Sequence, residues 1–95
     1  MRIEIDGGPS LGLSPVIVYL NRDEVAIRGA TVEVRGDMTH AGMSPVIERA
    51  TEVEPGIYRA EEFSFTMAGD WFITTDIELP EGDTLTESLP VTVPR

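Results

Sequence analysis

The residue types best suited to binding a metal lie close together in the middle of the chain. Met38, His40 and Met43 fall within six residues and include two of the four methionines and the only histidine. Thioether sulfur and imidazole nitrogen are soft to borderline ligands, and together they suit monovalent copper better than calcium, magnesium or manganese. The segment therefore predicts a copper(I) site, provided that the backbone brings these side chains together.

The spacing of these residues has a geometric consequence. If an extended strand continues through residue 40, Met38 and His40 point to the same side, because side chains two positions apart share a face. Gly42 then permits a turn that returns Met43 toward them. A further methionine, Met67, lies where another strand is predicted to end, and it completes the candidate ligand set.

A purely structural role would explain the same residues without a metal. Methionine commonly fills irregular space in cores, and a single histidine in a loop is more often solvated or structural than a ligand. Met67 also shares the alternation of Phe63 and Phe65, two expected core residues, which weakens its case as a ligand. We do not expect an enzyme, because Ser44 near His40 lacks an identifiable orienting acid and oxyanion hole.

Composition limits the class of protein further. The 95 residues fit one domain, spanning residues 1–95. With 17 acidic and 7 basic residues the net charge is -10, which argues against a nucleic-acid partner because phosphate binding needs clustered basic side chains. The absence of cysteine excludes disulfides and thiolate ligands. The longest apolar run, residues 16–20, is too short to span a bilayer, so we expect a soluble domain, with any export signal or membrane anchor carried by a longer native chain.

Short segments with alternating polarity predict an all-β fold with almost no helix. The predicted strands are residues 2–6, 16–20, 30–35, 46–53, 57–60, 71–79 and 85–93. Gly36 is expected to end the third of them, and residues 54–57 form a hairpin turn with proline and glycine in turn-favouring order. About seven short strands separated by glycine and proline indicate an antiparallel immunoglobulin-like β-sandwich. Trp71 and the phenylalanines are expected to fill its centre in place of a disulfide.

Four segments occur in a characteristic order, at residues 29–32, 38–45, 54–58 and 65–71. In this order they resemble the YtkA-like and FixH-like group of small bacterial immunoglobulin-like domains, over about residues 16–79. The resemblance implies an exported or membrane-anchored domain, periplasmic or on the outer face of the membrane. It further implies a metallochaperone or accessory role beside cytochrome oxidase assembly or heavy-metal efflux, with a protein partner. The implied copper ligands are Met38, His40, Met43 and Met67.

The chain departs from the resembling domains in having fewer methionines and histidines in this loop. A weaker site, or one completed by a partner protein, is therefore an open alternative. Another is a metal-free interaction or spacer module that contacts a second subunit through a sandwich face or an edge strand. If copper binds, only His40 among the ligands titrates, so affinity should fall below the ordinary histidine pKa of about 6.5 while the methionines continue to bind.

Overall fold

The computed structural model describes residues 1–39 and 44–95, which form strands and connecting turns without a helix. The strands are β1 (Arg2–Ile5), β2 (Gly12–Leu13), β3 (Val16–Tyr19), β4 (Asn21–Arg22), β5 (Val25–Ala26), β6 (Thr31–Met38), β7 (Val46–Glu54), β8 (Ile57–Ala60), β9 (Ser64–Phe65), β10 (Gly69–Glu78) and β11 (Thr84–Val93). Over these residues, no helix has the length and hydropathy needed to cross a bilayer. The all-β prediction is confirmed.

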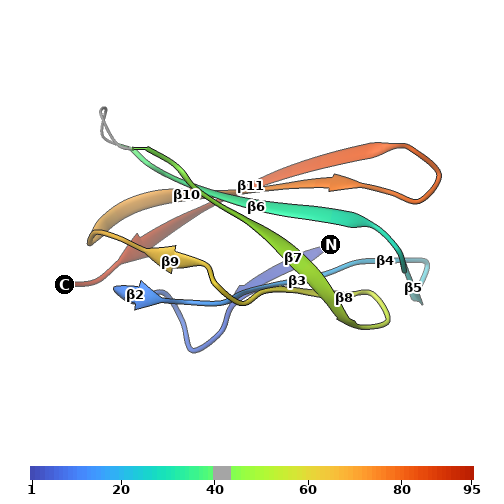
Figure 1. The fold of residues 1–95 in the computed structure, drawn as a ribbon, viewed down its shortest axis with the longest axis horizontal. Helices are drawn as coiled ribbons and strands as arrows, with labels where there is room; N and C mark the ends of the chain where they lie inside the picture. The colour runs from blue at the N-terminus through green and yellow to red at the C-terminus, as the bar shows by residue number, and fades with distance from the viewer. Residues whose placement is uncertain (40–43) are drawn as a thin grey trace.

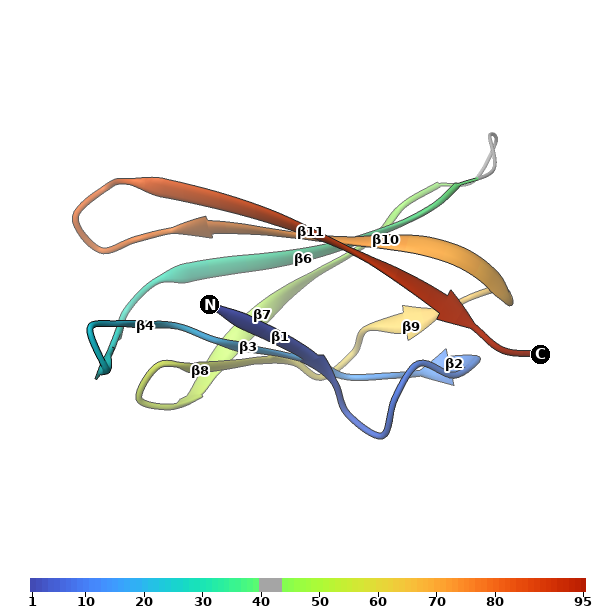
Figure 2. The ribbon, with the colours of Figure 1, turned by 180° about the vertical axis from the view of Figure 1, so that it is seen from behind.

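Seven strands follow one another in a single antiparallel row, in the order β1-β3-β8-β7-β6-β10-β11, beside two short pairs, β2-β9 and β4-β5. The row folds over into two layers, with β6, β10 and β11 in one and β1, β3 and β8 in the other (Figures 1 and 2). The strand β7 joins them, because residues 46–50 pair with β6 and residues 51–54 pair with β8. The fold is therefore sandwich-like, as predicted.

A register shift between Glu52 and Glu54 explains how β7 can pair with a strand of each layer. An irregularity of this kind bends a strand and increases its local twist. The hairpin predicted between β7 and β8 is present, and Gly56 in its turn has a φ of 77°, which glycine adopts at little cost.

The core lies between the two layers and is built mainly from alternate residues of the strands. Its buried members on β6 and β10 include Val32, Val34, Trp71, Ile73 and Ile77. Edge-to-face contacts connect the aromatic rings, with centroids 5.4 Å apart for Phe63 and Phe65 and 5.3 Å apart for Phe65 and Trp71. The prediction that Trp71 and phenylalanines fill the centre is confirmed.

The strand β6 is longer than the sequence predicted. It continues through Gly36 to Met38, so the prediction that Gly36 ends the strand is wrong. Gly36 is buried, and a Cβ atom on it would lie 2.6 Å from Cζ of Phe63. A glycine stands here because the phenylalanine ring occupies the space of a side chain, and its φ is not in the left-handed region.

The carboxylate of Glu52 connects two turns. It accepts hydrogen bonds from the backbone N–H of Gly29 at 3.0 Å and from that of Gly56 at 3.1 Å. These two bonds lower the pKa of Glu52 below its ordinary value of 4.5. A lowered pKa stabilises the folded protein above that ordinary value, and the contribution is lost as the pH falls through the folded-state pKa.

We therefore expect Glu52→Gln to lower the free energy of unfolding near neutral pH, and its difference from the wild type to shrink below about pH 4. Urea denaturation at both pH values measures this difference. Glu54→Gln is the matched control, because Glu54 is an exposed carboxylate on the same strand. Equal losses for the two variants at neutral pH, or a loss for Glu52→Gln that persists in acid, would contradict the expectation.

Candidate metal site at one end of the sandwich

Met38 is the last residue of β6, and it lies opposite Trp71 of β10. Its side chain is partly buried and packs against the hydrophobic core. The terminal methyl group lies close to Gly69, 3.1 Å from the position that a Cβ atom on Gly69 would take. Gly69 has a φ of 128°, a region that side-chain-bearing residues rarely adopt. The glycine therefore leaves room for the thioether at the edge of the core.

Pairing with β10 continues one residue beyond the end of β6. The backbone N–H of Thr39 donates to the carbonyl oxygen of Asp70 at 3.1 Å. The chain is thus held against β10 up to the residue before His40. The two remaining ligands predicted in this segment, His40 and Met43, lie outside the described residues, and their part in the site stays a prediction.

Met67 lies in the connection between β9 and β10. Its carbonyl oxygen accepts a hydrogen bond from the indole N–H of Trp71 at 3.0 Å. The Met67 residue is 49% exposed, whereas Phe63 and Phe65 are buried, so the expectation that Met67 shares their core-facing phase is wrong. The extended phase ends with β9 at Phe65, which frees the next residues to turn outward. The packing argument against Met67 as a ligand is thereby removed.

Trp71 is the residue that relates the two methionines. Met38 is its partner across the strands and Met67 is its hydrogen-bond acceptor. The end of β6 and the beginning of β10 lie at the same end of the molecule (Figures 1 and 2). The pattern of polarity predicts only a core position for Trp71. It does not indicate the hydrogen bond, because the acceptor is a main-chain carbonyl that every residue carries.

The carboxylates near this end are already engaged by other groups. Asp37 accepts from Arg35 Nε at 3.2 Å, and Asp70 accepts from the Thr92 hydroxyl at 2.9 Å. In the part of the chain that the structure describes, no group of three or more histidine, cysteine, aspartate or glutamate side chains could hold a metal ion. What these residues offer a metal is therefore thioether sulfur, which suits copper(I) rather than calcium or magnesium.

The structure thus defines a class of protein, a small all-β sandwich-like domain with two methionines near a tryptophan at one end. A family model described as YtkA-like matches residues 5–76, well over half of the chain. The chain belongs to the YtkA-like family. Searches among curated proteins and among solved structures gave no match. The YtkA-like part of the predicted resemblance is confirmed, and the FixH-like part stays a prediction.

Proposed function

We propose that this YtkA-like domain binds copper(I) outside the cytoplasm and acts as a carrier or accessory domain in cytochrome oxidase assembly or heavy-metal efflux. The observation that supports the proposal best is the position of Met38 and Met67. They are far apart in sequence, yet Met38 lies opposite Trp71 and close to Gly69, and the main-chain carbonyl of Met67 accepts the hydrogen bond of the Trp71 indole. His40 and Met43 complete the proposed ligand set.

The chemistry of the ligands suits an oxidising compartment outside the cytoplasm. Methionine sheds no proton when it binds a metal, and it cannot be locked into a disulfide as cysteine can. Met38 is only partly buried and Met67 is half exposed, so part of each residue lies at the surface of the domain. A partner protein could therefore reach the ligands directly, as a delivery function requires.

A titration with copper(I) under reducing conditions, against a competing chelator, tests the proposal. Met38→Leu and Met67→Leu remove sulfur at nearly constant volume, and we expect each to weaken binding by about tenfold or more. Met1→Leu is the matched control, since Met1 is a partly exposed methionine on the chain segment leading into β1. The emission of Trp71, the only tryptophan, provides a second readout because the proposed site adjoins its ring.

Equal affinity of the wild type and all three variants would refute the proposed site. Thermal unfolding then separates the proposal from its alternative, because a ligand bound only by the folded state raises the melting temperature. No shift at saturating copper would favour a metal-free interaction or spacer module. An open groove between the edge strands β1 and β11 supports such an interaction role.

A further inference from the structure

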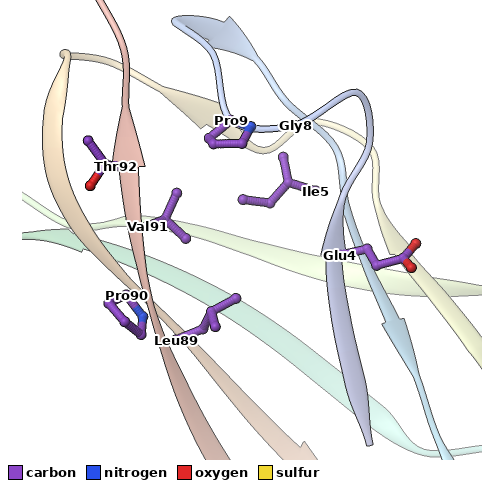
Figure 3. Close-up of a pocket in the computed structure, with 8 residues that line it drawn as sticks. All are labelled: Glu4, Ile5, Gly8, Pro9, Leu89, Pro90, Val91 and Thr92. Atoms are coloured by element: carbon purple, nitrogen blue, oxygen red, sulfur yellow. The ribbon is translucent and has the colours of Figure 1, made fainter.

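The row of seven strands has two ends, and both face the same space. In the described residues, β1 pairs with β3 alone and β11 pairs with β10 alone, so each strand has one unpaired edge. A groove of about 470 Å³ lies between them. It is lined by Glu4, Ile5, Gly8, Pro9, Leu89, Pro90, Val91 and Thr92 (Figure 3). An unpaired edge presents a row of main-chain N–H and C=O groups that another strand can satisfy.

The groove extends along both strands. A second hollow of about 200 Å³ lies between Met1 and Ile3 on one side and residues 87–89 on the other. Leu89 lines both hollows, so they lie next to each other along β11 and together make an elongated groove. Its length and its two flanking edges match an extended peptide better than a compact small molecule.

The floor of the groove is apolar. Figure 3 shows the side chains of Ile5, Leu89 and Val91 directed into the space between the strands, with the carboxylate of Glu4 pointing away from it. Ile5 and Val91 pack against the core and are only partly buried by the rest of the domain. Alternate side chains of an added strand would cover this surface, because every second residue of a strand points to the same side.

Pro90 limits which strands can pair here. Proline has no N–H to donate, and on an edge strand it discourages indiscriminate pairing. An occupant must therefore gain from burying apolar side chains on Leu89 and Val91 as well as from main-chain hydrogen bonds. The groove therefore favours a segment with apolar side chains at alternate positions over an arbitrary exposed strand.

Charge identifies the kind of occupant. The chain carries a net charge of -10, and the exposed Glu87 lines the groove beside Leu89. Glu4, on the other edge strand, points away from the groove and is already paired at 3.4 Å with Arg2, whose guanidinium lies 4.2 Å from the Tyr19 ring centroid. A second copy of this chain would bring another -10 to the interface, and like charges brought together disfavour association.

We propose that the groove between β1 and β11 binds an extended, basic segment of another protein, in which apolar side chains alternate with lysine or arginine. The apolar side chains enter the groove over Leu89 and Val91, and the basic side chains are attracted by Glu87 and by the net negative charge of the domain. This proposal does not depend on copper binding, since the groove is lined by residues other than Met38, His40, Met43 and Met67.

The test uses a blocked peptide of about eight residues that alternates valine with lysine, and a matched peptide that alternates valine with glutamate. Fluorescence anisotropy measures binding to the intact chain. We expect saturable binding of the lysine peptide alone, weakening as salt is added. Amide hydrogen exchange should slow at residues 2–5 and 87–92 when the peptide binds, because the added strand engages these edges.

Two variants assign the binding to the groove. Glu87→Arg reverses a charge at its border, and Glu54→Arg makes the same change in net charge on β7, three strands away from β1. We expect Glu87→Arg to weaken the lysine peptide by about tenfold and Glu54→Arg to have a much smaller effect. Val91→Ser, checked for folding by thermal unfolding, should weaken binding by shortening the apolar floor.

Several results would overturn the proposal. Equal binding of the two peptides would show that charge does not select the occupant, and equal effects of the two arginine variants would place binding elsewhere. Absence of binding, with a dimer in sedimentation that Glu87→Arg alters, would identify a second copy of the chain as the occupant instead. Absence of copper binding by the wild type, with the lysine peptide still bound, would refute the metal site and leave the groove proposal standing.

Discussion

Replacing Gly36 by alanine should lower the free energy of unfolding by about 1–3 kcal/mol. The added methyl group would lie 2.6 Å from Cζ of Phe63 and 3.4 Å from Cε3 of Trp71, so the aromatic cluster has to move. The direction of the change in the free energy of unfolding is informative. Replacing a glycine by alanine without strain raises that free energy by about 0.4–1 kcal/mol, because alanine restricts the unfolded chain. Urea denaturation of the two proteins measures the difference.

A double-mutant cycle connects this loss to the contact with Phe63. Phe63→Leu lowers the free energy of unfolding by itself, but it removes the end of the ring that the new methyl group would contact. We expect Gly36→Ala to cost less in the Phe63→Leu background, with an interaction energy of about 0.5–3 kcal/mol. If Gly36→Ala were neutral or stabilising, or if the two changes were additive, the close approach would not be the reason for the glycine.

Replacing Tyr58 by phenylalanine should have an effect of similar size, about 1–3 kcal/mol. The Tyr58 side chain is buried on β8, and its hydroxyl accepts from the backbone N–H of Ala30 at 3.0 Å and donates to the carbonyl of Ile27 at 2.7 Å. Phenylalanine fills the same space but leaves that N–H and that carbonyl unpaired. Burial raises the pKa of Tyr58 above its ordinary value of 10.0, so the hydroxyl remains a donor to a higher pH than that of an exposed tyrosine.

Tyr19→Phe is the matched control, since it deletes the same atom. The Tyr19 hydroxyl donates to Glu4 at 3.1 Å in an exposed position, where water replaces a lost partner, and we expect a change within about 0.5 kcal/mol. Hydrogen exchange at the Ala30 amide should quicken in Tyr58→Phe and stay unchanged in Tyr19→Phe. Equal stability of the two variants would show that the buried hydroxyl does not hold the segment before β6.

Within the site, local alternation accounts for the direction of Met38 but not for that of Met67. Alternation along β6 is continuous, so the direction of Met38 follows from Val32 and Val34. The same rule fails for Met67, because it applies only while the backbone remains extended, and β9 ends at Phe65. The proximity of Met38 to Trp71 depends on the pairing of β6 with β10, which a local pattern does not specify.

The groove between β1 and β11 likewise depends on an arrangement that local sequence patterns do not specify. Pro90 within an alternating segment is a signal for an edge strand, and the alternating polarity of residues 2–6 is typical of a half-buried edge strand. Neither observation says that the two edges face each other across an apolar groove. That arrangement arises because β7 bends from one layer to the other and brings the two ends of the row together.

By itself, the sequence determined the approximate positions of the seven strands of the row, the hairpin turn at Gly56 and the family of the domain. These properties depend on polarity and backbone preference over a few neighbouring residues, which the order of amino acids contains directly. Only the tertiary structure decided why position 36 is glycine, that Met67 is exposed, and which edges remain unpaired. Each of these depends on how distant parts of the chain pack and pair with one another, and a short-range pattern of residues does not specify that.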